Sequence, residues 1–217
     1  MTEEEWCALT YPTPMLEEAP LTSERKLRLF AVACCRRIWP CLRRTNGRRA
    51  VEVAEQYADG TATAEQLDQA SQAQHGAGIS ETEIRVIKCV TGRAVNEASL
   101  VLYASELYAD SIVPSRLPET AWDEADSAES TAQAELLRDI FGNPFRPVTF
   151  SAEWRTGTVV SLAAQMYESR DFSAMPILAD AFQDAGCDNN DVLNHCRDPK
   201  QVHVRGCWVV DLVLGKE

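Results

Sequence analysis

The 217-residue sequence lacks the long apolar run that a membrane-spanning helix needs, about 18 consecutive residues. Its first residues are acidic and no apolar segment follows them, which is unlike a secretory signal peptide. We therefore expect a cytoplasmic protein that has no membrane partner. In that compartment its eight cysteines are expected to be reduced thiols with packing or metal-binding roles.

The motifs of several common enzyme classes are also missing. The sequence contains no GxSxG turn, no phosphate-binding loop, no HExxH motif and no GxGxxG fingerprint. Histidine is scarce, because the chain has three, and two of them lie among the cysteines near the C-terminus. These absences favour a protein without catalytic residues.

Positive charge is in deficit, with 21 basic residues against 33 acidic ones and a formal net charge of −12. Such a chain repels phosphate backbones, so a nucleic-acid partner is not expected. The charge is uneven, however. Residues 24–49 contain nine basic residues and one acid, a local charge of +8 that leaves −20 for the rest of the chain.

The basic segment 24–49 gives the candidate residues for binding an acidic partner. Arginine forks match carboxylate and phosphate groups, and the candidates are Arg36, Arg37, Arg43 and Arg44. The other interpretation is that these arginines pair within the chain, for example with the acids of residues 119–126. We expect internal pairing or a protein partner to neutralise them.

Hydrophobic spacing predicts an all-α fold. Apolar residues recur at i, i+3, i+4 and i+7 after capping residues, which is typical of a bundle or array of about seven to nine helices. The last segment, 202–214, is almost wholly apolar, and a helix is favoured there over a strand. The other expected helices cover residues 22–38, 48–58, 64–74, 80–109, 119–141, 151–169, 173–185 and 190–197.

Two prolines within residues 110–118 mark the expected boundary between two packed lobes. The predicted domains are an N-terminal helical lobe, 1–112, and a C-terminal helical lobe, 113–217. One continuous domain is the alternative. Composition supports a folded body, since 45% of the residues are hydrophobic and 25% are charged.

Cysteines and histidines cluster near the C-terminus. Thiolate and imidazole are preferred zinc ligands, so the candidate metal ligands are Cys187, Cys196, His203 and Cys207. On a helix His203 and Cys207 would share a face, whereas the adjacent His195 and Cys196 diverge, so at most one of that pair should join a common ion. The spacing matches no paired CxxC signature, and plain core packing without a cofactor is the favoured interpretation.

Three long motifs carry a resemblance to known proteins. LRLFAVACCRRIW at 27–39, LLRDIFGNPFRPV at 136–148 and HVRGCWVVDLVLGK at 203–216 resemble a large paralogous family of uncharacterised planctomycete bacterial proteins. The match covers both ends of the chain and leaves the middle, about 60–130, unaccounted for. The resemblance implies a bacterial, cytoplasmic, helical protein and supplies no activity, ligand or site residue.

Three functional hypotheses follow. The first is a non-catalytic helical module that binds an unknown protein partner. The second is a metal-stabilised helical protein, with zinc as the ion, that contacts nucleic acid or an acidic partner through the basic segment 24–49. The third is an enzyme that uses the cysteine and histidine residues near the C-terminus. The sequence does not predict an oligomeric state.

Overall fold

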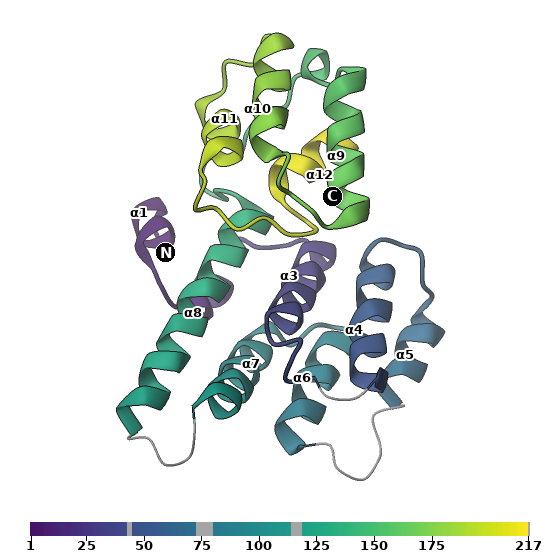
Figure 1. The fold of residues 1–217 in the computed structure, drawn as a ribbon, viewed down its shortest axis with the longest axis vertical. Coiled ribbons are helices and arrows are strands. Elements are labelled where there is room, and N and C mark those ends of the chain that lie inside the picture. The colour runs from purple at the N-terminus through teal and green to yellow at the C-terminus, as the bar shows by residue number, and fades with distance from the viewer. Residues whose placement is uncertain (43–44, 73–79, 114–118, 217) are drawn as a thin grey trace. The chain divides into compact units, whose positions relative to one another are not determined.

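In the computed structural model, residues 1–42, 45–72, 80–113 and 119–216 are described. They contain twelve α-helices, one short 3-10 helix and no strand, so the all-α prediction is confirmed while the expected helix count is too low. A search of this part of the chain finds no candidate for a membrane-spanning helix. Figure 1 shows the helices in order along the chain.

The chain forms two compact units, residues 1–137 and 138–217, and the division falls within a helix. It lies later in the chain than the boundary predicted at 112/113, and residues 114–118 are outside the described part of the chain. The first unit contains the helices α1 Glu3–Ala8, α2 Pro12–Glu18, α3 Glu24–Arg37, α4 Thr45–Ala58, α5 Ala64–Gln72, α6 Glu81–Thr91, α7 Glu97–Ile112 and most of α8 Glu119–Phe141.

Side-chain caps begin several helices of the first unit. The Ser23 hydroxyl accepts a hydrogen bond from the Lys26 amide at the start of α3, and Ser80 accepts one from Glu83 at the start of α6. Each cap satisfies an amide that has no partner inside the helix. α3 buries an apolar face that includes Phe30. This face forms part of a core around which α3, α4, α6 and α7 pack.

Several helices differ from the sequence-based prediction. The helices α1 and α2 were not expected, and the helix expected over 151–169 begins as α9 at Gly157. The expected helix 80–109 is two helices, because the chain leaves α6 at Gly92, where a Cβ atom would lie 2.8 Å from the Ala94 carbonyl oxygen. The buried Arg28 guanidinium donates hydrogen bonds to the carbonyls of Val90, Gly92 and Arg93 and so satisfies the end of α6. The helix expected over 48–58 begins earlier, because α4 runs from Thr45 to Ala58.

The second unit contains the end of α8, from Arg138, and five further helices. α9 packs against α10 and α12, and α11 packs against α10 and α12. Their buried apolar faces form one core that includes Met166, Phe182 and Val209. The five helices are η1 Ala152–Trp154, α9 Gly157–Ser169, α10 Met175–Asp184, α11 Asn190–Arg197 and α12 Trp208–Leu214.

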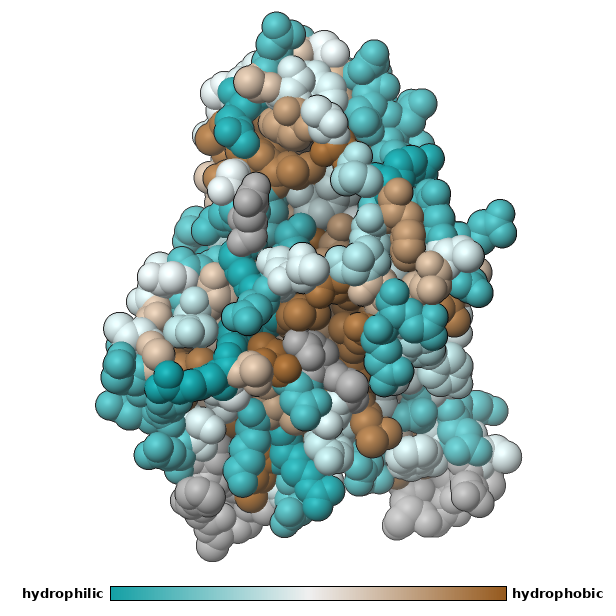
Figure 2. All heavy atoms as spheres, turned by 180° about the vertical axis from the view of Figure 1, so that it is seen from behind, coloured by the Kyte–Doolittle hydropathy of each residue, from teal (hydrophilic) through white to brown (hydrophobic). Residues whose placement is uncertain are grey.

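Hydrophilic residues cover much of the surface seen in Figure 2. Few large apolar side chains of the described residues are exposed, and these are Tyr11, Leu102, Ile177 and Val202. Isolated exposed apolar residues are normal on a folded protein. The helices therefore bury their apolar faces within the two units.

Candidate metal centre

The last turn of α8 brings one carboxylate into the second unit. Asp139 is fully buried, and its Oδ2 accepts a hydrogen bond of 2.9 Å from the Val204 amide. Its Oδ1 lies 2.9 Å from His203 Nδ1 and 3.3 Å from His195 Nε2. Burying a carboxylate without a partner costs free energy, so these neighbours help to stabilise Asp139 in its buried position.

α11 supplies the first histidine. Asn189 caps this helix by accepting hydrogen bonds from the amides of Asp191 and Val192. Cys196 belongs to the buried apolar face, whereas the adjacent His195 reaches the carboxylate of Asp139. The two neighbours diverge as expected for successive positions on a helix.

The segment between α11 and α12 supplies the other two side chains. The sequence predicted a helix over 202–214, but α12 begins only at Trp208, and Cys207 is its N-cap residue. Gly206 has a φ of +97°, a conformation that favours glycine, and the Cys207 amide closes a turn onto the Val204 carbonyl at 2.9 Å. His203 and Cys207 therefore meet through this turn and not along one helical face.

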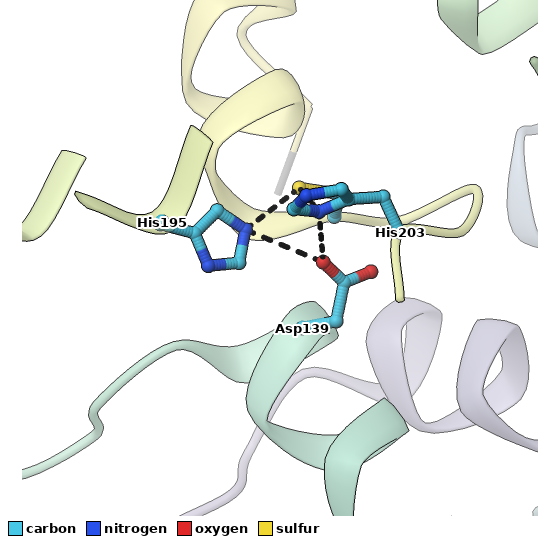
Figure 3. A group of neighbouring side chains, drawn as sticks. Asp139, His195 and His203 are labelled. Atoms are coloured by element: carbon cyan, nitrogen blue, oxygen red, sulfur yellow. Dashed lines mark hydrogen bonds and ion pairs between the residues drawn. The ribbon is translucent and has the colours of Figure 1, made fainter. Parts of the chain in front are cut away.

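The four side chains converge on one point, as Figure 3 shows for the three labelled residues. Cys207 Sγ lies 3.2 Å from His195 Nε2 and 3.9 Å from His203 Nδ1. One ligand atom from each of Asp139, His195, His203 and Cys207 lies within 4.8 Å of the others. A tetrahedral Zn²⁺ with bonds of about 2.0–2.3 Å has ligand–ligand edges of about 3.3–3.6 Å. The four contacts of 2.9 to 3.9 Å lie around these values, whereas the widest separation in the cluster, up to 4.8 Å, is longer.

Burial and the two histidines together determine the ionisation of Asp139 and Cys207. Burial acts to raise the pKa of Asp139, but hydrogen bonds and charge interactions with His195 and His203 outweigh it and hold the pKa below its usual value. Burial, reinforced by the negative charge of Asp139, raises the pKa of the Cys207 thiol well above its usual value. Without a cation the site thus favours a carboxylate beside a neutral thiol.

The cluster differs from the ligand set predicted from the sequence. It contains His203 and Cys207, whereas Cys187 and Cys196 lie in the apolar core of the unit. Burial raises the pKa of the Cys196 thiol to about 12, which fits a packed, protonated side chain.

Asp139 and His195 take the other two places in the cluster. Asp139 was missed because an acid on a helix is usually a surface residue. Its signal was its position three residues after Leu136, on a face that is otherwise apolar and buried.

The candidate arginines of the basic segment pair within the first unit where the structure describes them. Arg36 contacts Glu55 at 2.9 Å, and Arg37 makes a two-pronged pair with the buried Glu129 at 3.0 Å. The acidic partners are thus not the ones suggested within 119–126, although internal pairing itself was expected. Arg43 and Arg44 lie outside the described residues.

No family model matches the chain, and neither the curated proteins nor the solved structures contain a significant match to it.

Proposed function

We propose that this chain is a non-catalytic helical binding module whose second unit is stabilised by a structural Zn²⁺ ion. Asp139, His195, His203 and Cys207 would hold the ion. The observation that carries the proposal is the convergence of one carboxylate oxygen, two imidazole nitrogens and one sulfur within 4.8 Å. The ion would tie the end of α8 to α11 and to the start of α12.

The ligand types favour zinc. Calcium and magnesium prefer sites built from oxygen, whereas imidazole and thiolate suit zinc and similar transition metals. The Val204 amide donates a hydrogen bond to Oδ2 of Asp139, so Oδ1 is the oxygen that would bind the ion. Such a hydrogen bond from outside the ligand set orients the ligand, as is common around protein zinc sites.

Four protein ligands and strong burial favour a structural ion over a catalytic one. Catalytic zinc sites usually keep one position open for water or substrate. Here the side chains of Asp139, His203 and His195 are 0%, 7% and 10% exposed, and Cys207 is buried as well. These values support a closed site.

A Cys/His enzyme is less well supported by the same contacts. In a nucleophile–histidine–carboxylate relay, the histidine contacts the nucleophile with one ring nitrogen and the carboxylate with the other. His195 presents the single atom Nε2 to both Cys207 and Asp139, and His203 presents Nδ1 to both. A shared central cation explains that arrangement better than proton transfer does.

The bacterial and cytoplasmic setting, and the resemblance to the planctomycete family, remain predictions. The proposal that segment 24–49 contacts nucleic acid has less support than internal pairing. Arg36 and Arg37 already hold carboxylates of their own unit. Phosphate binding would have to replace those contacts.

Elemental analysis of the purified full-length chain tests the zinc proposal. We expect about one zinc ion per chain, and we expect His195→Ala and Cys207→Ser to lose it. Cys196→Ser is the matched control, because Cys196 is the sequence neighbour of His195 but packs in the core. This variant should keep the ion at some cost in stability, since it buries a hydroxyl.

Cobalt substitution gives a second readout. Co²⁺ added to metal-free protein should produce the visible absorption of a tetrahedral site and a sulfur-to-metal band that disappears in Cys207→Ser. A chain that binds neither Zn²⁺ nor Co²⁺ would refute the proposal. Loss of the ion in Cys196→Ser but not in His195→Ala would instead favour the ligand set predicted from the sequence.

A further inference from the structure

Among the described arginines of the basic segment 24–49, one has a side chain without a polar partner in its own unit. Most of the others contact carboxylates or backbone carbonyls, and these are Arg25, Arg28, Arg36, Arg37 and Arg48. Lys26 also has an interaction partner. Among the described basic residues of the segment, only the Arg49 guanidinium has no hydrogen bond, ion pair or ring contact.

Arg49 lines a cavity of about 300 Å³ between α4 and α5. The two helices pack against each other in the first unit and lie side by side in Figure 1. Ala50 and Val53, on the same side of α4 as Arg49, and Ala70 on α5 form the apolar part of the wall. The volume lies at the lower end of the range for ligand pockets, about 300–1,000 Å³.

The polar part of the wall is rich in carboxamides, from Asn46, Gln56, Gln66 and Gln69. A carboxamide both donates and accepts hydrogen bonds, which matches the donor and acceptor of a peptide group. Gln66 Oε1 already accepts a hydrogen bond from the Thr63 amide at 2.7 Å. Of the described residues that line the cavity, none is aromatic and none is acidic.

We propose that this cavity binds an extended, acidic segment of a partner protein, with Arg49 pairing with a carboxylate and the carboxamides contacting the peptide backbone. An arginine without a partner beside a cavity free of lining acids favours an anionic group. The absence of aromatic rings from the described lining gives a nucleobase no surface on which to stack. The site is separate from the proposed zinc centre and does not depend on it.

A peptide carboxylate fits better than a nucleic-acid backbone. Phosphate backbones are bound by several cations at once, and the structure leaves one guanidinium of the described basic segment unused. The net charge of −12 repels any anion over longer distances, and it repels a polyphosphate more strongly than a segment with one or two carboxylates. A single carboxylate requires only one such group, in a forked pair with Arg49.

Selection from a library of random short peptides against the full-length chain tests this inference. We expect enrichment of peptides that contain Asp or Glu. An enriched peptide, synthesised with a fluorophore, should bind Arg49→Gln about tenfold or more weakly, because a charge-assisted pair is lost. Replacing the acid of the peptide by its amide should weaken binding to the wild-type chain by a similar factor.

Two further variants keep the test specific. Arg85→Gln removes an exposed arginine of the same unit that pairs with Glu81 and does not line the cavity, so affinity should stay unchanged. Gln69→Glu places a negative charge in the cavity wall and should weaken binding without removing Arg49. Thermal melting of each variant checks that the fold is kept.

Three results would overturn the inference. The first is selection without enrichment of acidic peptides, and the second is equal affinity of the selected peptide for the wild-type chain and Arg49→Gln. The third is binding of a DNA oligonucleotide that Arg49→Gln abolishes while no peptide is enriched. That third outcome would assign the arginine to a phosphate.

Discussion

Two buried carboxylates of the first unit and one of the second have different kinds of partner. In the first unit, Glu55 and Glu129 are buried and each faces an arginine, Arg36 or Arg37. In the second unit, Asp139 is equally buried but faces two histidines and the Val204 amide, with the thiol of Cys207 beside them.

The difference shows which unit can balance its charge alone. Arginine stays protonated at all ordinary pH values, so each pair in the first unit is neutral without outside help. A thiol contributes no positive charge, and an imidazole does so only when it is protonated, whereas a bound cation is positive at every pH. A cation held beside Asp139 would therefore balance the charge of this carboxylate, whereas Glu55 and Glu129 already have arginine partners.

The largest expected effect is loss of the second unit on metal removal. Treating the zinc-loaded chain with a strong chelator should destabilise residues 138–216 by on the order of 5 kcal/mol or more, because metal binding is folding free energy. Hydrogen exchange followed by mass spectrometry should show faster exchange in α9–α12, with α3–α7 unchanged. Equal loss of protection in both units would contradict the comparison.

A smaller effect is expected from breaking an ion pair of the first unit. Glu129→Gln should lower the free energy of unfolding by about 2–4 kcal/mol, because it leaves a partly buried Arg37 without its carboxylate. The side chain of Arg37 is 33% exposed, so water compensates for part of the loss. Chemical denaturation measures the change.

Glu81→Gln is the control for that ion-pair variant. It breaks the exposed pair with Arg85 and should cost about 0–0.5 kcal/mol. Equal costs for the two variants would mean that burial of Glu129 does not matter. A loss of zinc from Glu129→Gln would show that this ion pair of the first unit also affects the metal centre.

A third prediction concerns a glycine beside the candidate metal centre. Gly142 has a φ of +66°, and a Cβ atom there would lie 3.1 Å from the ring of Trp208, which packs against His195. Gly142→Ala should cost about 2–4 kcal/mol from backbone strain and displacement of the indole. Gly186→Ala, at a φ of +81° with nothing within 4 Å of the added carbon, should cost about 1 kcal/mol.

Thermal melting compares the two glycine variants. Their difference isolates the contact with Trp208, since both carry the strain of a positive φ. If the costs were equal, the indole would not constrain this turn. Tryptophan fluorescence should also change in Gly142→Ala and not in Gly186→Ala.

The smallest expected effect concerns the reactivity of the cysteines. It involves no change in the stability of the zinc-loaded protein. The exposed Cys7 should react with an alkylating reagent at least about tenfold faster than the buried Cys34 and Cys35, whose pKa values are raised by burial. Chelation should expose Cys196 and Cys207 to the reagent while Cys34 and Cys35 stay protected. Mass spectrometry of the labelled peptides gives the order in which the cysteines react.

Local signals in the sequence predicted much of the secondary structure. The helices expected over 22–38 and from residue 80 begin near those positions and are capped by Ser23 and Ser80, because capping involves residues only three positions apart. The break at Gly92 was missed, since it depends on Arg28, which is far away in the sequence and binds the carbonyls that end α6. A single helix through 80–109 satisfied the local pattern equally well.

The candidate metal site was only half predicted. His203 and Cys207 were named for the right chemistry, but their contact comes from the turn at Gly206 and not from helical spacing. Cys187 and Cys196 have suitable chemistry too, and their positions in the core exclude them from the cluster. Residue type identifies possible ligands, whereas only packing selects among them.

The sequence by itself determined that the chain is helical, which faces of its helices are apolar and that its C-terminal part holds thiols and imidazoles, because these properties depend on residues a few positions apart. The tertiary structure decided which carboxylate each buried arginine meets and that Asp139 joins His195, His203 and Cys207. Asp139 and His203 are 64 positions apart. Their meeting depends on how helices pack to bury apolar surface, which local periodicity does not specify.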